Sequence, residues 1–526
     1  MPEEKDYEKT VGQICELLQT DPTPKTIKDL RDAFDELRKQ LVAGPFLQVF
    51  ETTLSRIPFS ALFSLLAAPD NKLIVSVAEV TRLLLRPVAW SIIHKTFEEY
   101  IVQGLKHPHR DVRYLVLEQF IKYKDKSEPL SVEYGPHIWL CLRGKVENDT
   151  TLIAQKVLSN LYNEGVGTEY LFSEKCKSAI ATVLSGDELQ RFRVYNVMAD
   201  ARLRHYTQLD PFIECGIMDA FMKEGSPDDL LVACNYYETL SALCENRACY
   251  SYFAGQGVFV SAFDVFVAAK DPSQEDRTIL GIAVIKMFTR LAGSCGIQME
   301  TFFKKYPLIR DLGQLVREDG DPMNRLKKVS IACLGAIGYN PLLLIHLAKE
   351  KAALDALVSG YKSSVGEMRV CYLQAFSCIF GHPEERTTRE SVVVEVEATK
   401  CSQICYELYM DLGGGELLAG VTKEIMKGFE DSCVAGLSVL QKLALHVWGV
   451  REMANHQNIV NFLLLRNASR SREVQQCQYA TVKSFVNAYP AKEAFDEDTY
   501  GRLVKYVREG PYFANAVPQV ALESSS

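Results

Sequence analysis

A turn followed by an amphipathic helix recurs along this chain about every 40 residues, and this repeat limits the folds open to the chain. A clear copy is residues 104–123, GLKHPHRDVRYLVLEQFIKY. There a His-Pro turn precedes a segment whose apolar residues recur every three or four positions, as they do in a half-buried helix. The stripe positions of that segment are Val112, Leu115, Val116, Gln119 and Phe120, of which all but Gln119 are apolar. The first buried position of each such helix serves as an anchor, and the ten anchors are Leu73, Val112, Ile153, Val194, Val232, Ile279, Val329, Val370, Cys433 and Val474. Six of the nine intervals between them are 38 to 41 residues long.

The period predicts an array of helix pairs, because two helices per repeat of this length are typical of HEAT and armadillo proteins. The partner helix is visible upstream of two anchors, in EYLFSEKCKSAIATVL at 169–184 and FAGQGVFVSAFDVFVAA at 253–269. Turn signals stand between the helices, namely HPHRD, GSPDD, KDPSQ and EDGDP. The sequence therefore predicts an all-α fold, a HEAT/armadillo-like superhelical solenoid of about ten helical repeats.

The repeat also predicts the domain organisation. A helix pair cannot bury its apolar face alone, so neighbouring pairs must stack, and we expect one continuous solenoid over residues 21–515. Residues 1–20 are expected to be a frayed amino-terminal segment and residues 516–526 a disordered tail. The longest interval between anchors predicts an insertion at about 381–428, with an extra helix bounded by loops.

Composition and charge argue against several functional classes for this chain. The net charge of −8 argues against nucleic-acid binding, which usually needs a basic face. The amino terminus MPEEKDYEKTVGQICELL is acidic where a secretory signal needs a basic region, and no apolar run approaches the ~20 residues of a membrane span. We therefore expect no membrane association and a cytoplasmic location, with the nucleus as a second compartment. The 15 cysteines form no C-x-x-C pair, which predicts reduced, mostly buried thiols.

No motif in the sequence predicts catalysis. DLGGGELL at 411–418 lacks the Walker pattern and is interpreted as a helix-ending loop. His107 and His109 are interpreted as turn residues, because no cysteine or acidic ligand stands at a matching spacing. The chain has no G-x-S-x-G, no H-E-x-x-H and no recognisable nucleophile with its base. We expect no enzyme activity, no catalytic residue, no metal and no cofactor.

The outward face of the anchor helices changes character along the chain. The position six after each anchor is Glu79, Glu118, Ser159, Asp200 and Glu238, and then Ile285, Gly335, Phe376, Val439 and Ala480. One interpretation is a solvated face early in the array and thicker packing late. The other is a partner-binding groove with an acidic end and an apolar end. The second interpretation gives five candidate partner-binding residues, which are Glu79, Tyr114, Glu118, Asp200 and Glu238.

Several blocks of the sequence resemble one known family, that of the 26S proteasome non-ATPase regulatory subunit 5, a base-assembly chaperone. The similar blocks include ALFSLLAAPDNKLIVSVAEVTRLLL at 61–85, LQRFRVYNVMADA at 189–201, MRVCYLQAFSCIFGHPEE at 368–385 and RLVKYVREGPYF at 502–513. The resemblance extends over about residues 60–515 in unbroken order.

The resemblance implies a function. Members of that family are helical-repeat proteins without catalytic activity. They bind the carboxyl-terminal domain of the base ATPase regulatory subunit 7, and they promote its assembly with regulatory subunit 4 and non-ATPase subunit 2. They also hinder premature docking on the 20S core. We expect the same of this chain, acting as a monomer.

Two alternatives remain open. The first is a general armadillo-like adaptor or scaffold for another partner, which typically carries a ladder of groove Trp and Asn residues. This chain has only Trp90, Trp139 and Trp448, far apart and out of register. The second is an enzyme on a helical scaffold, which would need several titratable groups converging in one cavity.

Overall fold

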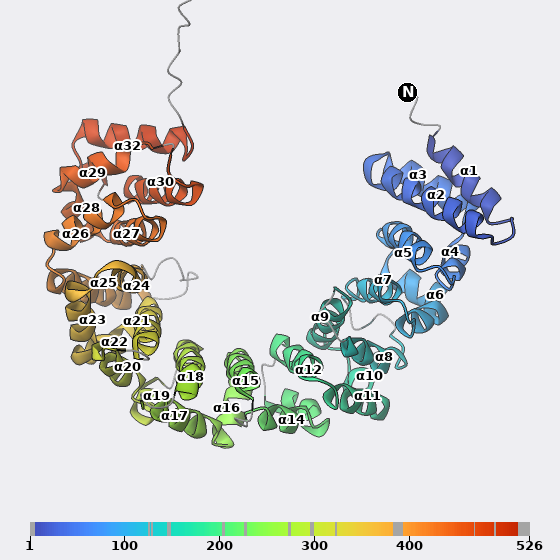
Figure 1. Ribbon diagram of the computed structural model, residues 1–526, viewed down its shortest axis with the longest axis horizontal. Coiled ribbons are helices and arrows are strands. Elements are labelled where there is room, and N and C mark those ends of the chain that lie inside the picture. The colour runs from blue at the N-terminus through green and yellow to red at the C-terminus, as the bar shows by residue number, and fades with distance from the viewer. Residues whose placement is uncertain are drawn as a thin grey trace, which may run out of the picture. The chain divides into compact units, whose positions relative to one another are not determined.

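A computed structural model describes residues 6–124, 127, 130–144, 149–201, 206–225, 229–271, 275–294, 299–320, 323–381, 393–467, 469–488 and 491–513. Within these ranges every regular element is a helix, and the chain divides into two compact units (Figure 1). Unit 1 is Met1–Tyr252 and unit 2 is Phe253–Ser526, and the boundary falls inside helix α16 (Arg247–Gly255). The predicted all-α class is confirmed.

Unit 1 consists of two rows of helices, a front row that carries anchors and a back row that covers it. The front row is α2 (Pro24–Ala43), α5 (Asn71–Leu85), α7 (Arg110–Phe120), α9 (Asp149–Asn163), α12 (Glu188–Asp200) and α15 (Leu230–Leu243). The back row is α3 (Phe46–Arg56), α4 (Phe59–Leu65), α6 (Trp90–Leu105), α8 (Tyr134–Leu140), α11 (Glu174–Leu184) and α14 (Ile217–Lys223). Shorter elements are η2 (Cys141–Arg143), α10 (Thr168–Leu171), η3 (Tyr206–Leu209) and α13 (Asp210–Glu214). Each front-row helix packs on the next one in the row (Figure 1).

Unit 2 has three helices per repeat. Its front row is α18 (Glu275–Ser294), α21 (Met323–Tyr339), α24 (Gly366–Ile379), α27 (Glu430–Leu443) and α30 (Arg472–Asn487), followed by α32 (Glu497–Glu509). The helices directly before them are α17 (Val258–Ala268), α20 (Leu308–Arg317), α23 (Lys351–Ser363), α26 (Gly415–Met426) and α29 (Gln457–Leu464). The third set is α19 (Met299–Lys305), α22 (Pro341–Lys349), α25 (Val393–Asp411), α28 (Val447–Ala454) and α31 (Ala491–Ala494). The sequence predicted two helices per repeat, and this additional helix makes the unit resemble an armadillo array.

The anchors of the sequence repeat fall in the front rows. Each of the ten lies in a different helix from α5 to α30, and seven of them are buried. The exceptions are Val232 and Val329, which are half-buried, and Ile279, which is 38% exposed. The helical period thus predicted the right helices. At the three anchors that are not buried, the predicted stripe is displaced by about one residue from the buried face.

Arginine side chains tie several front-row helices to the turn before them. Arg113 Nη1 donates to the carbonyl oxygens of His107 and Pro108, at 2.6 and 2.8 Å. Arg369 donates to Ser364 O and Arg191 to Gly186 O in the same way. Each arginine stands in the first turn and a half of its helix, so it satisfies turn carbonyls that no backbone amide reaches. These arginines therefore stabilise the turns that precede the front-row helices.

The amino-terminal segment corrects one prediction. Residues 1–20 were expected to be frayed, yet residues 6–17 form α1 (Asp6–Leu17), which packs on α2 and α3. Val11 and Ile14 of α1 are fully buried. The spacing of these residues and Tyr7 along one face allows the helix to cover the start of the row. The predicted tail at 516–526 lies outside the described residues.

The predicted insertion is largely a regular part of the array. Of residues 381–428, those from 393 onward include α25, the third helix of one three-helix repeat, and α26, the first helix of the next. Part of the additional length lies in α25, which has 19 residues where α22 has 9 and α28 has 8. Residues 382–392 lie outside the described residues.

Most of the described cysteines are buried. There are 14 of them, and eight are buried, among them the close pair Cys401 and Cys405. Burial raises the pKa of Cys141 to about 12 and also raises the pKa of Cys405, so both thiols stay protonated near neutral pH.

In the described ranges, no helix taken singly has the length and apolar character needed to cross a membrane. Two bent pairs, Arg247–Gly255 with Val258–Ala268 and Glu430–Leu443 with Val447–Ala454, satisfy that criterion together by length and composition only.

Candidate partner-binding groove

The front row of unit 1 is hollowed where its helices begin. One hollow, of about 440 Å³, is lined by residues of α5, α7 and α9, and includes Glu79, Arg82 and Tyr114. A second, of about 630 Å³, is lined by residues of α2, α5 and α7. Both are lined by Val75, Arg110 and Asp111, so they form one continuous groove across four front-row helices, which we call the front groove. The other residues lining it are Arg31, Asp32, Asp35, Asn71, Lys72, Ser76, Ala78, His109, Leu115, Asp149 and Thr150.

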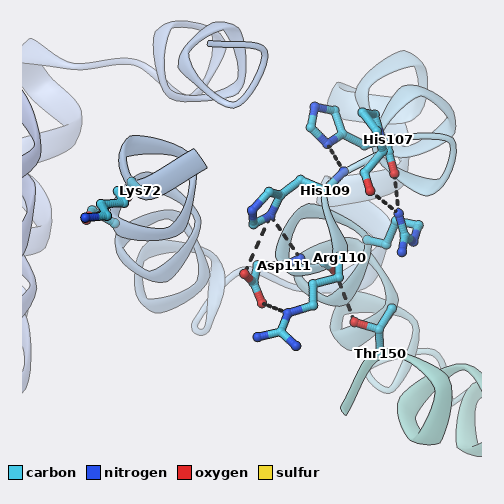
Figure 2. Close-up of polar contacts among 9 residues, drawn as sticks. Lys72, His107, His109, Arg110, Asp111 and Thr150 are labelled. Atoms are coloured by element: carbon cyan, nitrogen blue, oxygen red, sulfur yellow. Dashed lines mark hydrogen bonds and ion pairs between the residues drawn. The ribbon is translucent and has the colours of Figure 1, made fainter. Parts of the chain in front are cut away.

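His109, Arg110 and Asp111 of the HPHRD turn line the front groove, and Figure 2 shows their polar contacts. His109 is the N-cap of α7, and its Nδ1 accepts from the amide of Asp111 at 3.4 Å. His107 Nδ1 accepts from the amide of His109 at 3.0 Å, and burial lowers the pKa of His107. Thr150 Oγ1 donates to Arg110 O and so connects α9 to α7. Both histidines are turn residues, as their spacing indicated.

Two of the candidate carboxylates pair with arginines of neighbouring front-row helices. Glu79 of α5 lies 3.1 Å from Arg38 Nε of α2, and Glu118 of α7 lies 3.9 Å from Arg82 Nε of α5. The Arg82 guanidinium also lies over the ring of Tyr114, 5.8 Å from its centroid. Because these pairs are solvent-exposed, each contributes only about 0–1 kcal/mol to stability. The pairs remain available for exchange with a partner's charges.

The other two candidate carboxylates lie further along the same row. Asp200, the last residue of α12, is exposed and accepts from Gln155 Nε2 of α9 at 3.1 Å. Glu238 of α15 is also exposed, and no ion pair engages its carboxylate within the described residues. Ser159, which comes between Glu118 and Asp200 in the predicted column, is buried and donates to Gln155 O. The structure thus places Glu79 and Tyr114 in the front groove and Glu118 next to it, paired with the groove residue Arg82, and it leaves Asp200 and Glu238 outside the groove.

The apolar column predicted for the second half of the array is internal packing. Ile285, Phe376 and Val439 are fully buried, and Gly335 is in close contact with α24. The interpretation of this column as an exposed apolar binding end is wrong, and the interpretation as thicker packing is confirmed. The reason is that front-row helices of unit 2 approach closely, so the position six after the anchor faces the next helix.

Sequence reasoning missed the basic half of the front groove. Arg82, Arg110 and Lys72 line it and Arg38 pairs with Glu79, but none of these four stands at the position six after an anchor. One signal was available, because Arg82 stands three residues after Glu79 and therefore on the same helix face. The cross-helix pairing itself depends on how the helices pack.

The groove has the features of a protein-binding surface. Among the described residues, no group of three or more His, Cys, Asp and Glu is arranged to hold a metal ion. The lining combines five carboxylates with four arginine and lysine side chains and one tyrosine, all on rigid helices. Fold and groove together define the class of protein, a helical-repeat solenoid that presents a mixed-charge face to partners.

The particular family follows from comparison with known sequences. Residues 22–525 match the model of the proteasome non-ATPase 26S subunit family, so the chain belongs to that family. It is 23% identical to the 26S proteasome non-ATPase regulatory subunit 5 of Bos taurus, over 95% of this chain and 98% of that one. It is also 23% identical to the Homo sapiens protein of the same name, over 88% and 90% of the two chains. The predicted resemblance is confirmed.

Solved structures support the fold. Yeast importin-β aligns with a TM-score of 0.56 at 11% identity, over 95% of this chain and 68% of the other. At that identity the likeness concerns the fold alone, a solenoid of helical repeats. Such a fold is not typical of an enzyme.

Proposed function

We propose that this chain is an assembly chaperone of the proteasome regulatory particle. In this proposal it binds the carboxyl-terminal domain of the base ATPase regulatory subunit 7. It thereby promotes assembly with regulatory subunit 4 and non-ATPase subunit 2, and hinders premature docking on the 20S core. The observation that carries the proposal is the end-to-end family match over residues 22–525. The chain acts as a cytoplasmic, non-enzymatic monomer.

The proposed contact surface is the front row of unit 1. Its carboxylates Glu79 and Glu118 are half-buried, and Asp200 and Glu238 are exposed. The four lie on successive or near-successive front-row helices, and Tyr114 adds an aromatic side chain to the groove. Carboxylates at the rim of an interface speed encounter and select the partner, whereas a partly buried tyrosine contributes more to affinity. This arrangement suits a folded domain with basic residues on its surface.

The test is a binding measurement with purified chain against the isolated carboxyl-terminal domains of all six base ATPases, at low and high salt. We expect selective binding to regulatory subunit 7 that weakens as salt screens the charges. Binding to none of the six would contradict the proposal and favour an adaptor for another partner.

A charge-reversal variant tests the surface. The triple variant Glu118→Lys, Asp200→Lys and Glu238→Lys is expected to bind about tenfold more weakly by calorimetry, since three rim charges become repulsive. The matched control reverses three exposed back-row carboxylates of the same unit, Glu51, Glu99 and Glu174, and is expected to bind normally. Unchanged affinity of the front-row variant would exclude this surface without excluding the partner.

A further inference from the structure

A second hollow in unit 1, separate from the front groove, opens between α4, α6 and α7. It has a volume of about 90 Å³ and shares only Leu115 with the front groove. Its walls are mainly apolar and include Phe63, Leu85, Ile93, Phe97, Val112 and Val116. We call it the aromatic pocket. Its size is that of a single side chain.

Aromatic rings form the mouth of the aromatic pocket. Phe63, Phe97 and Tyr100 are each half-buried, so their rings reach solvent. Phe63 lies 5.2 Å from Phe97 in an edge-on arrangement and 4.8 Å from Tyr100, measured between ring centroids. α6 departs from helical geometry at Phe97, with φ −129° and ψ 22°, and the ring of this residue lies against α4. Partly exposed aromatic side chains are enriched at sites where proteins bind one another.

Gln119 is the polar exception in the apolar stripe of α7, and it lines the aromatic pocket. Its side chain is 3% exposed. Nε2 donates to Leu115 O at 2.8 Å, and because a carbonyl can only accept, this bond fixes which way the amide points. Oε1 is then left without a hydrogen-bond donor. A leucine at this position would pack without that cost.

The other polar side chains that line the aromatic pocket are His107, Gln103 and Tyr100, of which Tyr100 is half-buried. His107 accepts from the His109 amide, and its ring also contacts the backbone of Leu66. Gln103 is exposed and donates to Glu99 at 3.2 Å. A water molecule needs two to four polar partners in such a place, and Gln119 Oε1 supplies one. The pocket therefore matches an apolar group that carries a single donor.

We propose that the aromatic pocket binds a tyrosine side chain of a partner protein. The ring lies among the rings at the mouth and the aliphatic walls, and the phenol O–H donates to Gln119 Oε1. Phenylalanine lacks the donor, and serine or threonine lacks the apolar body. A lysine or arginine would bring a charge among walls that contain no carboxylate. The inference is independent of which protein the front groove binds.

The test compares two blocked amino acids, N-acetyl-tyrosinamide and N-acetyl-phenylalaninamide, binding to the full chain by ligand-detected NMR. The tyrosine compound is expected to bind about fivefold more tightly, the factor for one net hydrogen bond. In Gln119→Leu, which removes the acceptor and keeps an apolar side chain there, this preference is expected to disappear. Gln103→Leu makes the same change at the exposed rim and is expected to keep it.

A third variant tests the location. Ala67 lies exposed at the edge of the aromatic pocket, so Ala67→Phe covers the mouth without disturbing a buried contact and is expected to abolish binding of both compounds. Equal affinity of the wild-type chain for the two compounds would overturn the proposal in favour of a general apolar site. Binding of neither compound, or a preference that survives in Gln119→Leu, would also overturn it.

Discussion

Lys122 shows how one side chain joins neighbouring repeats. It follows α7, and its Nζ donates to Leu85 O and Val88 O at 2.6 and 2.9 Å. Leu85 is the last residue of α5 and Val88 follows it by three residues, so the cation complements the negative end of the helix. The amine is half-buried, and burial lowers the pKa of Lys122 to about 8. Lys122 thus satisfies carbonyl oxygens at the end of a helix, and its amine titrates close to physiological pH.

The titration of Lys122 predicts a pH dependence of stability. Its pKa is about 8 in the folded chain and 10.5 ordinarily, so between these values the unfolded chain binds more protons. Stability from this residue therefore rises as pH increases from about 8 to about 10. We expect the free energy of unfolding in urea to rise more over this range in the wild type than in Lys122→Met. Lys122→Arg, which stays charged throughout, should behave like Lys122→Met. Equal pH dependence of all three would contradict this assignment.

At the scale of elements, the spacing between front-row helices is set by small residues. Gly335 of α21 faces Ala375 of α24, and a Cβ on Gly335 would lie 2.7 Å from Ala375 Cα and 3.1 Å from Ala375 O. Backbone this close cannot accommodate a methyl group unless the helices separate. The absence of a side chain at Gly335 therefore allows α21 and α24 to pack along their length.

This contact predicts the effect of one methyl group. Gly335→Ala is expected to lower the free energy of unfolding by about 1–3 kcal/mol, since overpacking outweighs the gain in helix propensity. Gly293→Ala in α18 is the matched control, because a Cβ there meets no atom within 4 Å. That control is expected to be slightly more stable than the wild type. Urea unfolding followed by circular dichroism measures both, and a loss of equal size in both variants would contradict the packing argument.

At the scale of the whole molecule, contacts are local along the chain. Front-row helices pack on the next of their row and on the helices just before them, in unit 1 and in unit 2 alike. An array of this kind behaves as a sum of repeats and nearest-neighbour interfaces, so a defect in one repeat disturbs its neighbours first.

The buried ion pair of Glu224 tests this locality. Arg191 of α12 donates through Nε and Nη2 to the Glu224 carboxylate at 2.5 and 3.1 Å, and Tyr195 O–H donates to it at 2.8 Å. We expect Glu224→Ala to destabilise the chain by about 2 kcal/mol, because Arg191 is partly exposed and the loss is smaller than for a fully buried pair. Hydrogen exchange should accelerate in α12, α14 and α15 and remain unchanged in α27 and α30.

A control keeps this measurement specific. Glu174 of α11 pairs with Lys177 but is 89% exposed, so Glu174→Ala is expected to leave both stability and exchange unchanged. Faster exchange across both units in Glu224→Ala would contradict a nearest-neighbour array.

The sequence by itself determined the helices and their repeat. Helix periodicity is a local property, since a buried stripe every three or four residues can be identified without knowing what covers it. The ten anchors therefore fall in ten front-row helices, and the turn roles of His107 and His109 follow from the residues beside them. The family resemblance likewise needed only the order of the blocks along the chain.

The tertiary structure decided which faces of those helices are covered. Glu79 and Phe376 occupy the same position of the repeat, yet one is partly exposed beside Arg38 and the other is fully buried. The difference depends on how closely the next helix approaches, and Gly335, at the same position of the repeat, allows α24 to approach α21 closely. The unpaired Oε1 of Gln119 arises in the same way, because three helices surround it and none offers a donor. The sequence pattern identifies the apolar face of a helix, but only the packing of the helices determines which residues contact that face.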